Sequence, residues 1–276
     1  MRVPRQRVLH LGLLPGRDSL ILAAVTTDRW IILRGLTREV GHWGGFATTL
    51  AAAIPDAEIV PLELPGVGTL RDRPWPGDIA AAMEDVRARA GRATSGGRTF
   101  VFGMSLGGMV TMEWAARHTG ELAGIVVGAS SARDLSRPWQ RMKPAALPAV
   151  LGGRVRRDVG AREEAIVRVV TNRADRWPDV SMRWSEIARL RPIRGAVARG
   201  QLAAAMRWNA PRNLAVPSLF LVGTTDRLVD ASCSRALARR YAAPLVEHPT
   251  AGHDLSTDEP EWLAGEIARW HAGVAR

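Results

Sequence analysis

One serine lies in a sequence context that could supply a nucleophile. Ser105 is at the centre of Gly103-Met104-Ser105-Leu106-Gly107, a Gly-x-Ser-x-Gly motif. An apolar run typical of a buried strand precedes the motif, and an amphipathic stretch typical of a helix follows it. In this setting the serine occupies a sharp turn, and the flanking glycines let strand and helix approach each other closely. We therefore expect Ser105 to be a nucleophile.

A serine hydroxyl is a weak nucleophile at neutral pH, so it needs a general base, and the base needs an orienting carboxylate. Asp226 directly follows a predicted strand over residues 218–222, and His253 follows the last predicted strand, over residues 244–248. The order serine, acid, histidine is that of one hydrolase fold and differs from the orders in chymotrypsin and subtilisin. We expect His253 to take the Ser105 proton and Asp226 to orient His253.

Other side chains compete for these roles. Asp134 also follows a strand, from which a carboxylate could reach the histidine, and it remains an alternative to Asp226. Asp230 is expected to cap the following helix, and Asp254 to point away from the neighbouring histidine. His42 lies just past the first strand, where it could line a pocket, but a packing role is the default for it.

Acyl transfer also needs two N–H donors that face the developing oxyanion. The backbone of Leu106, directly after the nucleophile, is expected to give one donor. The backbone of Leu36, in the loop after the first strand, is expected to give the other, with Gly35 leaving room for the loop to turn. Gly35 and Met104 adjoin these groups, so we expect both to contact a substrate.

Beyond residue 28 the chain alternates apolar runs with amphipathic stretches, which predicts a parallel sheet covered by helices. Strands are predicted over 30–34, 57–62, 99–104, 123–128, 218–222 and 244–248, and helices over 40–53, 78–90, 106–117, 232–242 and 259–272. The strand pattern disappears over 131–212, where Arg, Trp and Met recur with helical spacing. We expect a core of residues 1–130 and 213–276, with 131–212 as a helical cap (lid) over the carboxyl edge of the sheet.

Large apolar side chains within 131–212 could line a ligand pocket. Most of them are expected to form the small core of the segment itself. Two or three are expected to face the pocket, since ligand sites are lined mainly by apolar and aromatic groups. The candidates for contact with a substrate are Trp139, Trp177, Trp184 and Trp208.

The positive charge of the chain is concentrated in the same segment. The chain has 38 Lys and Arg against 27 Asp and Glu, a net charge of +11, and residues 131–212 contain 18 of the former and 7 of the latter. Arg154, Arg156 and Arg157 form one run, and Arg189, Arg191 and Arg194 another. These runs either recruit an acidic substrate or partner, such as a carrier protein, or simply cover a solvated face. No nucleic-acid recognition motif accompanies them, so no nucleic-acid partner is expected.

These motifs resemble the α/β-hydrolase superfamily over residues 28–130 and 213–272. The Gly-x-Ser-Leu-Gly-Gly elbow and the long cap are similar to those of carboxylesterases of the carrier-protein methyl ester esterase type. Arg34-Gly35 stands where many members have His-Gly, and Glu63 stands in the place of the usual acid of the turn over residues 63–68. The resemblance implies an α/β-hydrolase fold and a serine hydrolase that cleaves small carboxylic esters through an acyl-enzyme, with no metal or organic cofactor.

Two alternatives remain open. One is an esterase or thioesterase for acyl groups linked to a carrier protein or coenzyme A, and the other is a non-catalytic binding protein on the same scaffold. The single cysteine, Cys233, excludes an intramolecular disulfide framework. No apolar run reaches the roughly 18–20 residues of a membrane span, so we expect a cytoplasmic protein. Residues 1–25 faintly resemble a secretory signal, interrupted by Pro15 and Gly16, which leaves secretion open.

Overall fold

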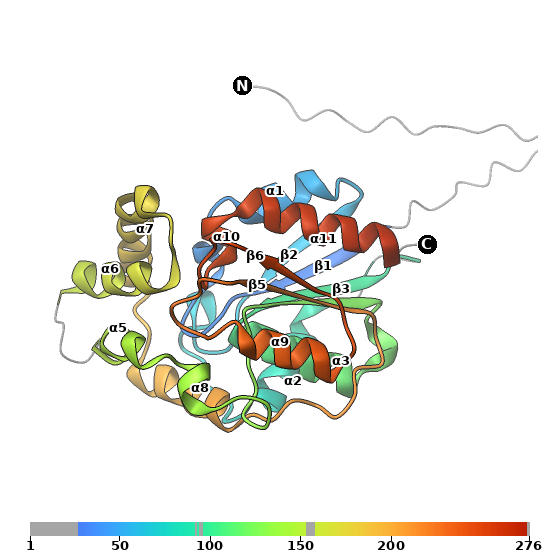
Figure 1. The fold of residues 1–276 in the computed structure, drawn as a ribbon, viewed down its shortest axis with the longest axis horizontal. Coiled ribbons are helices and arrows are strands. Elements are labelled where there is room, and N and C mark those ends of the chain that lie inside the picture. Colours follow the sequence, from blue (N-terminus) through green and yellow to red (C-terminus); the bar gives the residue numbers. More distant parts are fainter. Residues whose placement is uncertain (1–26, 92, 94–95, 153–157, 275–276) are drawn as a thin grey trace, which may run out of the picture.

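The computed structural model describes residues 27–91, 93, 96–152 and 158–274 (Figure 1). The N-terminal stretch that resembles a secretory signal lies outside these ranges, as do Arg154, Arg156 and Arg157 of the first arginine run. Within the described ranges, every helix is too short or too polar to span a bilayer.

In the described part of the chain, six parallel strands form one sheet in the order β2-β1-β3-β4-β5-β6. The strands are β1 (Asp28–Leu33), β2 (Ala57–Leu62), β3 (Thr99–Met104), β4 (Gly124–Gly128), β5 (Ser218–Gly223) and β6 (Leu245–His248). Each predicted strand is present, and no end differs by more than two residues. Since β1 lies between β2 and β3, the direction of strand order reverses there. Open α/β sheets bind ligands in the crevice beside such a reversal.

Helices cover both faces of the sheet: α1 and α11 lie on one face, and α2, α3 and α9 on the other (Figure 1). Their bounds are α1 (Phe46–Ala53), α2 (Ile79–Ala90), α3 (Leu106–Arg117), α9 (Ser232–Arg240), α10 (Leu255–Asp258) and α11 (Pro260–Val274). Short 3-10 helices span Val40–Trp43, Gly68–Leu70, Thr119–Glu121, Pro144–Ala146 and Ala174–Arg176. The predicted helix over 40–53 is divided in two because Gly44, with a φ of 56°, ends the first piece.

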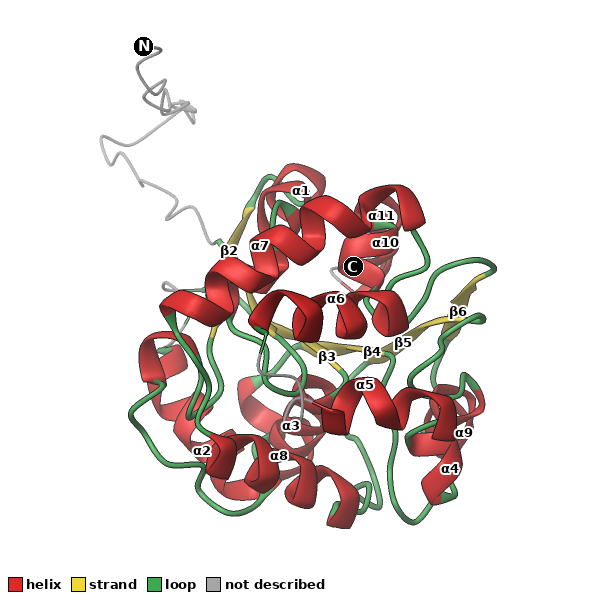
Figure 2. Cartoon of the chain, turned by 90° about the vertical axis from the view of Figure 1, so that its left-hand side faces the viewer, coloured by secondary structure: helices red, strands yellow, loops and turns green. Residues whose placement is uncertain are grey.

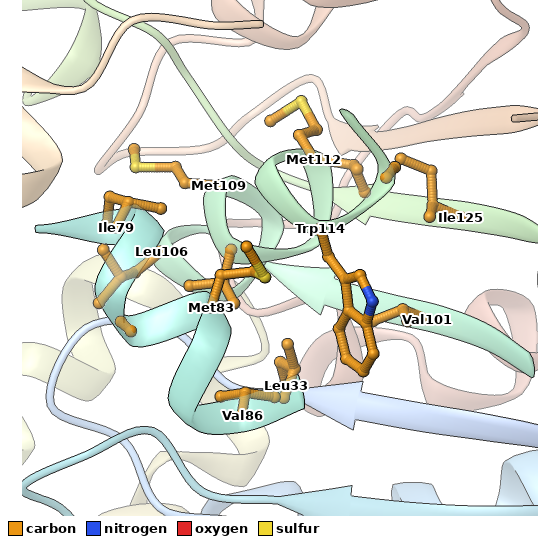
Figure 3. Close-up of a cluster of buried hydrophobic side chains, with 14 of the residues drawn as sticks. Leu33, Ile79, Met83, Val86, Val101, Leu106, Met109, Met112, Trp114 and Ile125 are labelled. Carbon is orange, nitrogen blue, oxygen red and sulfur yellow. The ribbon is translucent and has the colours of Figure 1, made fainter. Parts of the chain in front are cut away.

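The two faces of the sheet bury alternate residues of each strand. In β1, Trp30 and Ile32 belong to the apolar cluster beneath α1 and α11, and Ile31 and Leu33 to the cluster beneath α2 and α3. Figure 3 shows the second cluster, in which residues such as Met83 of α2 contact the face of the sheet. Burial on both faces explains why these strands appear in the sequence as continuous apolar runs.

The chain between β4 and β5 forms the helices α4 (Pro138–Arg141), α5 (Leu147–Leu151), α6 (Val159–Val170), α7 (Trp177–Leu190) and α8 (Gly195–Arg207). We call this segment the insertion. Figure 2 looks at the molecule from its side, with α5 to α8 grouped in front of the sheet. The helices α6 and α7 pack on each other around Val167, Val170, Val180 and Trp184. The insertion therefore has a small apolar core of its own.

The glycine after the predicted nucleophile has no space for a side chain. A Cβ atom on Gly107 would lie 2.5 Å from the carbonyl oxygen of Leu33 and 2.6 Å from that of Arg34. Because both oxygens belong to backbone, the end of β1 would have to move away from α3. Gly107 therefore allows α3 to pack directly against β1.

We predict that Gly107→Ala lowers the free energy of unfolding by at least about 2 kcal/mol, since overpacking a rigid site typically costs about 1–3 kcal/mol or more. Gly265→Ala is the matched control, because nothing lies within 4 Å of a Cβ there and the residue is inside α11. Replacing this helical glycine should stabilise the protein by about 0.5–1 kcal/mol. Urea unfolding measures both changes, and equal effects at the two positions would contradict the packing argument.

Candidate active site

Ser105 lies in a strained turn between β3 and α3. Its φ is 54° and its ψ is −115°, in a region that non-glycine residues rarely adopt. Two hydrogen bonds hold the turn: the Ser105 N–H donates to the carbonyl of Gly128 (2.8 Å), and the Ser130 hydroxyl donates to the carbonyl of Ser105 (2.9 Å). This is the geometry of a nucleophile elbow, which presents the serine side chain at the edge of the sheet.

His253 and Asp226 contact each other directly. The His253 Nδ1 atom lies 2.7 Å from the Asp226 Oδ2 atom, and both side chains are buried. The other carboxylate oxygen, Oδ1, accepts the N–H groups of Leu228 (2.7 Å) and Val229 (2.9 Å). An ionised carboxylate can only accept a hydrogen bond, so Nδ1 of the neutral ring is the donor and the lone pair is on Nε2. Asp226 thus fixes the orientation and the tautomer of His253.

Two opposed effects set the pKa of His253. Burial disfavours the charged imidazolium, but the charge of Asp226 and its hydrogen bond to the ring outweigh this, so the pKa of His253 is raised above 6.5. A buried imidazole beside a buried carboxylate can accept a proton more readily than free imidazole does.

Ser105 and His253 line the same cavity, which has a volume of about 490 Å³. Within the described structure no hydrogen bond joins the Ser105 hydroxyl to His253. In the structure, His253 and Asp226 are therefore in direct contact, and Ser105 faces the same cavity as His253. Catalytic hydrogen bonds commonly tighten only when substrate is bound.

The loop after β1 runs directly against Ser105. A Cβ atom on Gly35 would lie 3.1 Å from the Cβ of Ser105, and the N–H of Arg38 closes a turn onto the carbonyl of Gly35 (3.2 Å). In the described part of the chain, the N–H groups of Leu36 and Leu106 donate to no acceptor. Leu36 lines the cavity, and Leu106 is buried at the start of α3. These two predicted donors are therefore both available.

Sequence reasoning missed Gln201, which supports the same loop from the insertion. The Gln201 side chain is fully buried on α8, and its Oε1 atom accepts the N–H of Thr37 at 2.8 Å. Thr37 has a φ of 60°, an unfavourable value for a β-branched residue. No motif marks Gln201 in the sequence, since its partner lies 164 residues away.

A buried ion pair joins this loop to the segment that carries the histidine. Arg34, directly before Gly35, contacts Asp254, directly after His253, with Nη2–Oδ2 at 2.5 Å and Nη1–Oδ1 at 3.2 Å. Burial would raise the pKa of Asp254, but the Arg34 charge outweighs it and lowers that pKa to about 2. As expected, Asp254 points away from the neighbouring histidine. The pair gives Arg34 a structural role at the start of this loop.

The remaining alternatives occupy other places. Asp134 accepts the N–H of Ala210 (2.9 Å), and Asp230 accepts the N–H of Ser232 (3.0 Å) at the start of α9. His42 is buried against Trp184, with ring centroids 5.2 Å apart. None of the three contacts His253 within the described structure, whereas Asp226 does.

The predicted substrate contacts divide into two groups. Gly35, Met104 and Trp184 line the cavity. The other three tryptophans do not line it, contrary to expectation: Trp139, Trp177 and Trp208.

Each of these tryptophans has another position. Trp139 is 55% exposed on α4. Trp177 donates its ring N–H to the carbonyl of Thr171 (3.2 Å) and packs on the core of the insertion. Trp208 is buried in the main core and donates to Glu113 (2.9 Å). Helical spacing alone did not show which side of each helix faces the sheet.

The described residues include no group of three His, Cys, Asp or Glu side chains placed to hold a metal ion. Cys233 is fully buried, and burial raises the pKa of its thiol to about 11. The thiol is therefore neutral and has no reactive character at ordinary pH.

A model of the Alpha/beta hydrolase family matches residues 31–266. No protein of curated function matches the chain in sequence. The predicted fold class is confirmed by this match together with the parallel sheet and its helical layers.

Solved structures with the same fold include two esterases and a lactonase. A thermophilic esterase from Thermogutta terrifontis is 22% identical, with a TM-score of 0.66 over 91% of this chain and 92% of that one. An esterase from Rhodococcus sp. ECU1013 is 19% identical, with a TM-score of 0.69 over 90% and 91%. An enol-lactonase from Burkholderia xenovorans LB400 is 19% identical, with a TM-score of 0.69 over 89% and 92%. At these identities the likeness is one of fold.

We predict that the His253 ring titrates above pH 6.5 and that Asp226→Asn moves its titration to lower pH. The substitution removes the charge that raises the pKa and leaves the burial that lowers it. NMR titration of the histidine rings measures both values. Asp134→Asn, at the alternative acid, should leave the His253 titration unchanged. If Asp134→Asn shifted the His253 titration and Asp226→Asn did not, Asp134 would be the acid.

We predict that Arg34→Met lowers the free energy of unfolding by about 3–5 kcal/mol, because it leaves the Asp254 carboxylate buried without its counter-ion. Arg194→Met is the control, since Arg194 pairs with Asp72 at the surface, and its loss should cost no more than about 1 kcal/mol. Chemical denaturation at pH 7 measures both. Similar losses of unfolding free energy for the two variants would contradict the argument that the buried Arg34 pair contributes more to stability than a surface pair.

Proposed function

The chain belongs to the Alpha/beta hydrolase family, and we propose that within it this protein is a carboxylesterase that acts on small esters. The observation that carries the proposal is the 2.7 Å contact of His253 with the buried Asp226, beside the cavity that His253 and Ser105 both line. A binding protein on this scaffold would not need a buried acid behind an oriented base, with that base and a strained serine in one cavity. This favours catalysis over binding alone.

The proposed reaction has two steps. His253 Nε2 takes the Ser105 proton as the Ser105 oxygen attacks the ester carbonyl, and Asp226 stabilises the imidazolium that forms. The free N–H groups of Leu36 and Leu106 bind the oxyanion of the tetrahedral intermediate. His253 then gives the proton to the leaving alcohol, and water releases the acid by the reverse sequence of proton transfers. The reaction requires no metal or organic cofactor.

In this proposal the insertion is a cap that shapes the substrate site. Residues of α5, α6, α7 and α8 supply much of the cavity lining, including Ile166, Trp184 and Leu202. A volume of about 490 Å³ is in the range of sites for small ligands. The esterases and the lactonase with this fold act on ester bonds, according to their names, which supports the same bond type here.

The arginines of the insertion help to decide between a free ester and an acyl group linked to a carrier protein as the substrate. Arg191 pairs with Glu39 of the core, and Arg194 pairs with Asp72. Two of the three arginines in this run are therefore engaged with core carboxylates, which favours a free ester over an ester on an acidic carrier protein.

We predict that Ser105→Ala lowers the hydrolysis of a short p-nitrophenyl ester by at least about 10³-fold, since the variant lacks the nucleophile. Ser181→Ala is the control, because the Ser181 hydroxyl has no hydrogen-bond partner in the described structure and does not line the cavity. It should keep full activity.

A fluorophosphonate probe should label Ser105 in the native protein and leave Ser105→Ala unlabelled. The urea midpoint of Ser105→Ala should stay close to the native value, because alanine keeps the Cβ atom and the hydrogen bonds that hold the turn use the backbone of Ser105 and not its hydroxyl. Full activity in Ser105→Ala would refute the assignment of the nucleophile.

A further inference from the structure

Charged side chains gather on the cavity wall next to the loop that contains Leu36. Arg38 is in the turn closed onto Gly35, and its Nη1 atom donates to Glu163 of α6 at 2.7 Å. The neighbouring Arg162 contacts the same carboxylate at 3.2 Å. Both arginines line the cavity. A group bound here would therefore lie beside the proposed oxyanion site.

His42 adds a donor without an acceptor to this wall. The N–H of Glu39 donates to His42 Nδ1 (3.1 Å), and this backbone donor cannot turn away as a side chain can, so the neutral ring that fits it has its proton on Nε2. Burial and the charges of Arg38 and Arg34 keep the pKa of His42 well below 6.5, so the ring is neutral at pH 7. The Nε2 atom lies 3.1 Å from Arg38 Nη1, which is itself a donor. This side chain is only 3% exposed, and its Nε2–H has no acceptor in the described part of the chain.

The cavity wall has more positive than negative groups. Its described charged residues are five arginines and three acids: Arg34, Arg38, Arg162, Arg191, Arg199, Glu39, Glu163 and Asp254. Asp254 and Glu39 each have one arginine as partner, Arg34 and Arg191.

Glu163 alone must serve both Arg38 and Arg162, and Arg199 forms no ion pair in the described ranges. Residues 153–157 could not supply a carboxylate, because none of them is Asp or Glu. Among the described residues, the wall therefore carries an excess of two positive charges.

We propose that Arg38, His42 and Arg162 form a subsite for a carboxylate of the substrate, so that the preferred ester carries a second, ionised carboxyl group. The proposal rests on the esterase function proposed above. A carboxylate has two oxygens, which can accept the His42 Nε2–H and the guanidinium donors together. It would satisfy the buried donor and offset one excess charge, whereas a neutral ester would do neither.

The test compares esters that differ only in charge. Methyl hydrogen glutarate carries the carboxylate on the acyl side, and its primary amide is the neutral match. 3-Acetoxypropanoate carries the carboxylate on the alcohol side, and its primary amide is the neutral match. We expect kcat/KM of the native protein to be at least about tenfold higher for the acid than for the amide in one of these pairs, and that pair identifies the side.

Arg162→Gln and His42→Phe should each reduce this acid-to-amide ratio at least about threefold. Arg168→Gln is the control on the same helix, because Arg168 pairs with exposed Glu164 and does not line the cavity. It should leave the ratio unchanged. Calorimetry with Ser105→Ala gives a readout without turnover: methyl hydrogen glutarate or 3-acetoxypropanoate should bind more tightly than the matching amide.

The outcomes separate the two proposals. If the native protein hydrolyses no ester, including a p-nitrophenyl ester, the function is wrong. If it hydrolyses esters but prefers neither acid to its amide, the subsite is wrong. An acid preference that survives in both Arg162→Gln and His42→Phe would also overturn the subsite.

Discussion

The backbone of Ser105 is in a conformation that costs a non-glycine residue on the order of 1–3 kcal/mol, and its surroundings must hold it there. Gly107 lets α3 approach the end of β1, and the Gly128 and Ser130 contacts fix the turn from β4. The serine is therefore positioned by the middle of the sheet, where both faces are buried. The position of every other proposed catalytic group is defined relative to this turn.

Around the serine, loops that are distant in sequence are joined by buried polar contacts. The pair Arg34–Asp254 connects the loop after β1 to the segment after β6, across 220 residues. Asp226 connects the loop after β5 to His253. The folded protein loses much stability when one partner of a buried charged pair is missing. These contacts therefore favour one arrangement of the loops over others. That selectivity matters for catalysis, in which small displacements of reacting groups cost rate.

The sequence predicted the sheet well because its signals are local. Residues such as Trp30 and Ile31 face opposite layers that are both buried, so each strand appears as an apolar run between turns. The motif around Ser105 is equally local, and Ser105, Asp226 and His253 each follow the end of a predicted strand, β3, β5 and β6.

What the sequence could not predict depends on contacts between distant segments. Trp139, Trp177, Trp184 and Trp208 were candidates for the cavity, and of the four only Trp184 lines it, since the side that each insertion helix presents depends on its neighbours. The roles of Arg34 and Gln201 depend on partners more than 160 residues away. Part of the positive charge behind the net +11 also has a structural role that the sequence did not show. Arg191 and Arg194 of the insertion form ion pairs with acidic residues of the core.

The side-chain amide of Gln201 connects the insertion to the loop that faces Ser105. If α8 moves away from the sheet, the Gln201 oxygen leaves with it, and Thr37 loses the acceptor that supports its positive φ. Opening of the cavity by this route and loosening of the loop are then one event. For the esterase reaction proposed above, the ordered loop that holds Leu36 would then require α8 in place.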